Sequence, residues 1–293
     1  MGLHVPIAGG ISNSVDNASR QGCSAFQIFS RNPKGWTAKP LAPQELEDFK
    51  MRLEKSNITR DSTYVHMPYL PNLSSPNESL HEKSVIVLLE ELKRCTMLGI
   101  PYLVLHFGSN LGSGREAGIN QFISACSFAL EKHTSSLSSS KSSASAHSHK
   151  VTILLENNVG HKNTIGSKFE DIRLILDKLN SFQNFIGICL DSCHAFAAGY
   201  DLRSEEGVEI TFEKFDDIVG QKNLKLIHLN DSRGKLGSSL DRHETLGLGE
   251  IGNDGIEALC TEKSISSIPF IMETPREKHA EDMKLIRSII SKL

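Results

Sequence analysis

The chain has 293 residues, of which 39% are hydrophobic and 23% charged, a composition that is typical of a soluble globular protein with a sizeable core. No apolar run approaches the roughly 18 residues of a membrane span, and the formal net charge of −3 excludes a general electrostatic attraction to nucleic acid. The six cysteines form no CxxC pair and follow no secretory signal, so we expect free thiols and an intracellular protein of the nucleus or cytoplasm.

Short apolar segments alternate with stretches of helical periodicity along the whole chain. The apolar segments have the length of buried strands and cover residues 3–8, 25–30, 63–67, 102–107, 151–156, 185–190, 224–229 and 269–273. The clearest helical stretches between them cover residues 43–55, 82–98, 118–131 and 169–179. Strands that alternate with helices predict a parallel sheet, and eight such units predict a (β/α)8 TIM barrel that occupies residues 1–293 as a single domain.

Two segments interrupt this alternation. Residues 134–149 read TSSLSSSKSSASAHSH, and this Ser-rich tract has too few apolar residues to pack, so we expect a mobile loop before the fifth strand. Its two histidines, His147 and His149, are interpreted as solvated. Residues 231–254 form a long glycine-rich loop after the seventh strand, and such loops at the carboxyl-terminal ends of barrel strands are usually functional.

Histidines and acidic residues gather at the predicted carboxyl-terminal ends of six consecutive strands and on the loop after the seventh. They are His66, His106, Glu156, Asp191, His194, His228, Asp241, His243 and Glu273. In a barrel these ends converge on one mouth, where four carboxylates would repel one another unless cations lie between them. The pattern therefore predicts a metal centre. Imidazole and carboxylate ligands suit zinc, with manganese or iron as alternatives, and the number of ligands suffices for about three ions. Cys193 is interpreted as a packing residue.

The sequence around these residues resembles the endonuclease IV family, the zinc-dependent apurinic/apyrimidinic (AP) endonucleases. The resemblance covers essentially the whole chain and rests on HMPYLPNL, LDSCHAFAAGYD, HLNDS, GSSLDRHETLG and METP. It implies three zinc sites, formed by His66, His106 and Glu156; by Glu156, Asp191, His228 and Glu273; and by His194, Asp241 and His243. It also implies hydrolysis of the phosphodiester 5′ to an abasic site in duplex DNA, which leaves a 3′-hydroxyl and a 5′-deoxyribose phosphate in base excision repair.

Catalytic roles and DNA contacts follow from the same resemblance. Glu156 would bridge two ions and Glu273 would bind an ion or orient the hydroxide held between them, while the third zinc would stabilise the leaving oxygen. Tyr69 matches a residue that the family inserts into the duplex, although an aromatic lid is an alternative, and Lys34 lies where an arginine is more usual. The basic residues of the predicted mouth loops, which would either contact phosphates or remain solvated, are Arg31, Arg233, Lys235 and Arg242. We expect a monomer.

Two other functions fit parts of the pattern. Metal-dependent sugar isomerases and epimerases place similar residues at strand ends of related barrels, but they typically need one or two ions, so the third cluster argues against them. A non-catalytic protein that binds damaged DNA would have little need for a bridging carboxylate. The sequence therefore favours an AP endonuclease over both alternatives.

Overall fold

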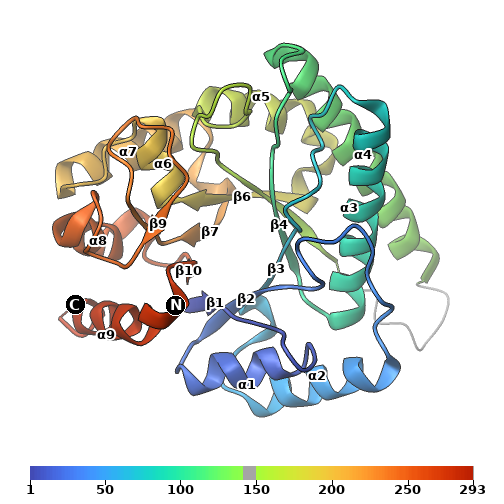
Figure 1. Ribbon diagram of the computed structural model, residues 1–293, viewed down its shortest axis with the longest axis horizontal. Coiled ribbons are helices and arrows are strands. Elements are labelled where there is room, and N and C mark those ends of the chain that lie inside the picture. Colours follow the sequence, from blue (N-terminus) through green and yellow to red (C-terminus); the bar gives the residue numbers. More distant parts are fainter. Residues whose placement is uncertain (141–149, 293) are drawn as a thin grey trace.

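A closed barrel of parallel strands lies inside a ring of helices, as the computed structural model of residues 1–140 and 150–292 shows (Figure 1). The barrel strands are β1 (Gly2–His4), β2 (Ala25–Phe29), β3 (Thr63–His66), β4 (Tyr102–His106), β5 (Thr152–Glu156), β6 (Ile186–Asp191), β7 (Leu224–His228) and β10 (Phe270–Met272). Each strand pairs in parallel with the next in chain order, and β1 closes the barrel against β10. The predicted TIM barrel is confirmed.

The helices cover the outside of the barrel. They are α1 (Asn13–Arg20), α2 (Pro43–Lys55), α3 (Glu78–Leu98), α4 (Arg115–Ser140), α5 (Phe169–Lys178), α6 (Ser192–Ala198), α7 (Glu205–Ile218), α8 (Gly252–Thr261) and α9 (His279–Ile290). Helix α3 begins earlier than its apolar periodicity indicates because the Asn77 side chain caps it by accepting the backbone N–H of Leu80. Among the described residues, no helix combines the length and the apolarity that a membrane span requires.

The interior of the barrel is filled by a group of apolar side chains that come from seven of its strands. They are Ala25, Tyr64, Val104, Leu154, Cys189, Leu226 and Ile271. On β1, Gly2 leaves room for this packing, since a Cβ there would lie 1.8 Å from the carbonyl oxygen of Ala25. Because side chains alternate along a strand, the residues two positions further on also point inward. These residues are His4, Gln27, His66, His106, Glu156, Asp191, His228 and Glu273. They form what we call the polar layer, at the carboxyl-terminal mouth.

The described part of the Ser-rich tract is helical and not a loop. Residues 134–140 continue α4, so the prediction of a loop is wrong there. The hydroxyl of Thr134 donates to the carbonyl of Leu130, and that of Ser136 donates to the carbonyl of His133, which satisfies these polar groups within the helix. Residues 141–149, including His147 and His149, lie outside the described residues.

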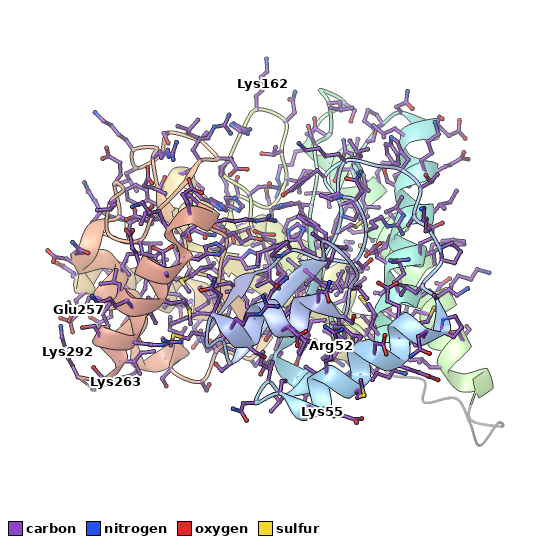
Figure 2. The ribbon with its side chains drawn as sticks, turned by 60° about the horizontal axis from the view of Figure 1, so that its bottom comes forward. Arg52, Lys55, Lys162, Glu257, Lys263 and Lys292 are labelled. Carbon is purple, nitrogen blue, oxygen red and sulfur yellow. The ribbon has the colours of Figure 1, made fainter. Side chains whose placement is uncertain are left out.

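The long loop after β7 is more ordered than the sequence indicates. It contains two short antiparallel strands, β8 (Asp231–Ser232) and β9 (His243–Glu244), before α8 begins at Gly252. The mouth and the opposite end of the barrel are well separated. Figure 2 shows Lys162, on the loop after β5, at the end of the molecule opposite Lys55 and Lys263.

Candidate metal centre

Glu156, the last residue of β5, lies at the centre of the polar layer and is fully buried. Its Oε2 lies 3.0 Å from His66 Nε2 and 3.6 Å from His106 Nε2. Its Oε1 lies 3.0 Å from His228 Nδ1. Burial acts to raise the pKa of this carboxyl group, but the surrounding imidazoles outweigh burial and hold the pKa well below its usual range. One carboxylate is thus shared by histidines from three other strands.

The first two predicted ligand sets both come together around this carboxylate. The possible ligand atoms of His66, His106 and Glu156 all lie within 4.8 Å of one another. The same limit holds for the set of Glu156, Asp191, His228 and Glu273. The nearest carboxylates to His228 Nδ1 in this second set, besides Glu156, are Glu273 at 3.4 Å and Asp191 at 3.9 Å. Glu156 is therefore placed to contribute to both sets.

The third predicted set comes together beside the second. Helix α6 follows β6 directly, and Asp191 caps it by accepting the backbone N–H of His194 at 2.8 Å. This helix directs His194 Nε2 to within 3.4 Å of Asp241 Oδ1, and His243 Nε2 lies 3.8 Å from the same oxygen. Asp241 is half-exposed, and its hydrogen bond with His194 lowers the pKa of its carboxyl group to about 2. The possible ligand atoms of His194, Asp241 and His243 lie within 4.8 Å of one another.

The donors of this cluster fit divalent cations. Among the described residues, His243 Nε2 is a buried nitrogen without a hydrogen-bond partner, and it faces Asp191 and Asp241 at 3.6 and 3.8 Å. A buried polar atom without a partner is costly, and a metal ion would satisfy it. The mixture of imidazole and carboxylate donors suits zinc, manganese or iron. Cys193 Sγ is also close to Asp191 and His243, and burial raises the pKa of its thiol.

A buried carboxylate, Asp231, holds the loop that carries Asp241 and His243. Its oxygens accept the backbone N–H groups of Ser232, Gly247, Gly249, Ile251 and Gly252 at 2.7 to 3.3 Å. The close approach requires glycine, since a Cβ on Gly249 would lie 2.4 Å from Asp231 Oδ1. The carboxylate therefore fixes the path of the loop, although it is no candidate ligand itself.

Asp231→Ala is expected to lower the free energy of unfolding by about 3 kcal/mol or more, because several buried N–H groups lose a charged acceptor. The variant should also lose the metal of the third set. Urea unfolding and elemental analysis would check both effects, with the exposed Asp254→Ala on the same segment as the control. Wild-type stability and metal content in Asp231→Ala would contradict this role.

Sequence reasoning missed two residues of the polar layer, His4 and Gln27. Both contact Glu273, with His4 Nδ1 at 3.1 Å and Gln27 Nε2 at 2.7 Å from its Oε1. The sequence contained a pattern that could have identified them. His4 and Gln27 follow the inward-facing Gly2 and Ala25 by two residues, and every other residue of the polar layer follows an inward-facing apolar residue by the same distance. Gln27 also interrupts the otherwise apolar strand AFQIF.

A cavity of about 420 Å³ opens above the metal centre and is lined in part by Tyr69 and Arg242. The ring of Tyr69 is 62% exposed and contacts Phe29 edge-on, with 5.0 Å between ring centroids. Lys34 does not line this cavity. It is exposed on the neighbouring loop. The backbone N–H of Tyr69 donates to the carbonyl oxygen of Pro33 at 3.1 Å, which links this loop to the one that carries Tyr69.

Arg31 is not available to contact a phosphate, so that prediction is wrong. The residue is buried, with its guanidinium paired to Glu91, which is also buried, and to Glu90. Arg233 and Lys235 are exposed, and Arg233 pairs with Glu244 at 2.9 Å. The Arg31 pair therefore anchors the start of the loop that carries Lys34.

Arg31→Ala is expected to lower the free energy of unfolding by about 3–5 kcal/mol, because it removes the closest positive charge from the buried Glu91 carboxylate. Arg233→Ala, which removes an exposed ion pair, should change it by less than about 1 kcal/mol. Urea unfolding would compare the two. A stable Arg31→Ala protein that binds DNA poorly would instead restore the phosphate-contact interpretation.

A barrel with imidazoles and carboxylates at its mouth defines the class of xylose isomerase-like TIM barrels, and residues 15–289 match the family model of that description. The probable endonuclease 4 of Nitrosopumilus maritimus is 47% identical, over 98% of this chain and 97% of the relative. The crystal structure of endonuclease IV from Thermus thermophilus has a TM-score of 0.83 at 31% identity, covering 99% of this chain and 98% of the other. The chain belongs to the endonuclease IV family.

Membership of this family confirms the resemblance found in the sequence and makes the chain a nuclease of the hydrolase class. A D-tagatose 3-epimerase-like protein has a TM-score of 0.71 at 18% identity, covering 100% of this chain and 98% of the other. That likeness is one of fold alone.

Proposed function

We propose that the chain is a DNA repair endonuclease that hydrolyses the phosphodiester 5′ to abasic sites in duplex DNA. It would leave a 3′-hydroxyl and a 5′-deoxyribose phosphate, act as a monomer inside the cell, and use three zinc ions, with manganese or iron as alternatives. One observation carries the proposal: three groups of histidines and carboxylates, each with its possible ligand atoms within 4.8 Å, adjoin one another at a single barrel mouth.

Divalent cations bound by these groups would lower the pKa of water and offset the negative charge of a phosphodiester. Glu156 would hold the first two positions next to each other, because its two oxygens face different histidines. Glu273 would orient a water beside the scissile phosphate, and its 17% exposure and its position in the lining of the cavity support this role. His194 and Asp241 would place the third position on the side of the cavity formed by α6 and the loop.

DNA contacts are proposed for Tyr69, Lys34 and Arg242, which are all exposed. Tyr69 and Arg242 line the cavity above the metal centre, where an abasic nucleotide would have to enter. Extrusion costs least where the base is already missing, which favours abasic sites over intact nucleotides.

Tyr69→Ala is expected to weaken binding to an abasic duplex about 10-fold, within the ~1–3 kcal/mol of an aromatic stacking contact. Arg242→Ala should reduce the slope of log K against log salt concentration by about 1. Fluorescence anisotropy over a salt series would measure both. Lys55→Ala removes a basic residue at the opposite end of the molecule and should change neither quantity. Equal effects at Lys55 and Arg242 would argue against a DNA face at the mouth.

The proposed reaction is tested with a duplex that carries one stable abasic analogue and a label on either end of the damaged strand. The expected result is incision immediately 5′ to the analogue, a 3′-hydroxyl that a polymerase extends, and no incision of the matched intact duplex. Epimerisation of ketoses is assayed in parallel with the same metal-loaded protein. Ketose epimerisation without incision would overturn the proposal.

A further inference from the structure

Gln27 is a fully buried amide in β2 whose side-chain hydrogen bonds all go to the metal centre or to its neighbour His4. Its Nε2 donates to Glu273 Oε1 at 2.7 Å, and its Oε1 lies 2.9 Å from His228 Nε2. Burying an amide is unfavourable unless its polar atoms are paired. The flanking residues Phe26 and Ile28 are buried and apolar, so the local structure gives no reason for a glutamine here.

The partners fix which way the amide points. The carboxylate oxygens of Glu273 accept hydrogen bonds, so the amide nitrogen of Gln27 must face Oε1, which lies 2.7 Å away. The opposite orientation would place two acceptor oxygens 2.7 Å apart. The amide oxygen therefore faces His228.

This orientation determines the tautomer of His228. Because the amide oxygen of Gln27 can only accept, the ring nitrogen that faces it, Nε2, must carry a proton. In a neutral imidazole the lone pair then lies on Nδ1. That nitrogen faces carboxylate oxygens of Glu156 at 3.0 Å, Glu273 at 3.4 Å and Asp191 at 3.9 Å, the other members of its ligand set.

The same amide also orients Glu273. Oε1 is the oxygen that Gln27 and His4 contact, at 2.7 and 3.1 Å. The other oxygen, Oε2, is the one that lies 3.4 Å from His228 Nδ1. Gln27 thus directs two ligand atoms from two different strands toward the same point.

We propose that Gln27 is a positioning residue of the second metal set, because its one amide group fixes both the Nδ1 lone pair of His228 and the Oε2 atom of Glu273 toward one cation. The inference rests on the proposed metal-dependent function. Removing a residue that orients metal ligands by hydrogen bonds, without binding the metal itself, typically lowers metal affinity by about 10–100-fold.

Gln27→Met keeps the length of the side chain and removes its hydrogen bonds with Glu273, His228 and His4. Zinc retention is measured by elemental analysis after equilibration with a series of competing chelator concentrations. We expect one site to bind zinc about 10–100-fold more weakly than in the wild type. Thr63→Val is the matched control, since it removes a part-buried side-chain hydrogen bond, to the carbonyl of Arg60, from the adjacent strand β3. Unchanged zinc affinity in a folded Gln27→Met protein would overturn the inference.

A second measurement needs no variant. Long-range proton–nitrogen correlation spectra of the zinc-loaded wild-type protein report which imidazole nitrogen of His228 carries the proton. We expect the proton on Nε2 and zinc on Nδ1, and the reverse arrangement would overturn the inference even if Gln27→Met fails to fold. Failure of the proposed function is a separate result, in which the wild-type protein neither retains zinc nor cleaves abasic DNA.

Discussion

Glu156→Gln is expected to lower the rate of incision at abasic sites by about 10²–10³-fold or more, the scale of losing one group that stabilises the transition state. The reason is that both oxygens of Glu156 face imidazoles of two ligand sets, and an amide can offer only one acceptor atom. Metal should therefore be lost from two sets at once. Single-turnover incision and elemental analysis on the same preparation would measure both effects.

The matched control for this substitution is Glu131→Gln, which makes the same chemical change on the exposed surface of α4. It should retain full activity and full metal content. If Glu156→Gln cleaved at a rate near that of the wild type, the idea of two metal positions that share one carboxylate would be wrong.

Zinc binding to the metal-free protein is expected to release protons and to strengthen as the pH rises. Although burial acts in the opposite direction, the surrounding carboxylates raise the pKa of His194 to about 10 and raise the pKa values of His66 and His228. The imidazole of His194 is therefore protonated near pH 7 in the metal-free protein, and zinc must displace that proton. Below pH 10, each displaced proton should increase the apparent zinc affinity about tenfold per pH unit.

The raised pKa of His194 also makes the stability of the metal-free protein depend on pH. The folded pKa of His194, about 10, exceeds the ordinary value of 6.5, so its ion pairs stabilise the metal-free protein fully below pH 6.5. This stabilising contribution is lost as the pH rises through about 10, because the imidazole of His194 then loses its proton and its positive charge. Calorimetric titrations at pH 7 in buffers of different ionisation enthalpy would count the released protons. A zinc affinity that is constant between pH 6 and pH 9 would contradict this prediction.

The positions of the site residues were predictable because, in a barrel of parallel strands, residues at the carboxyl-terminal ends of the strands all lie at the same mouth. Six consecutive barrel strands, from β3 to β10, end at or next to a histidine or a carboxylate, as in β3 with His66 and β7 with His228, and parallel strands bring those ends to one mouth. The three ligand sets that the resemblance implies are the groups that lie together in the structure. Whether they bind metal is a prediction that the experiments above would test.

What the sequence did not reveal depends on contacts between distant segments. The sequence around Arg31 indicates an exposed basic residue on a loop. Only the structure shows that Arg31 is buried against α3, where it pairs with Glu91. Asp231 reads as part of a polar loop, yet it organises backbone groups as far away as Gly252. Gln27 could have been found from its offset to Ala25, but its partners, His228 and Glu273, lie on strands at the other end of the chain.

The central claim is that three metal positions at one barrel mouth serve a single hydrolysis, and zinc counting linked to incision tests it most directly. Purified protein would be analysed for zinc per chain and for incision of the abasic duplex before chelation, after prolonged chelation and after zinc is restored. The predicted result is about three zinc ions per chain, with activity that is lost and regained together with them. Full incision by protein that holds one metal ion per chain, or none, would contradict the claim.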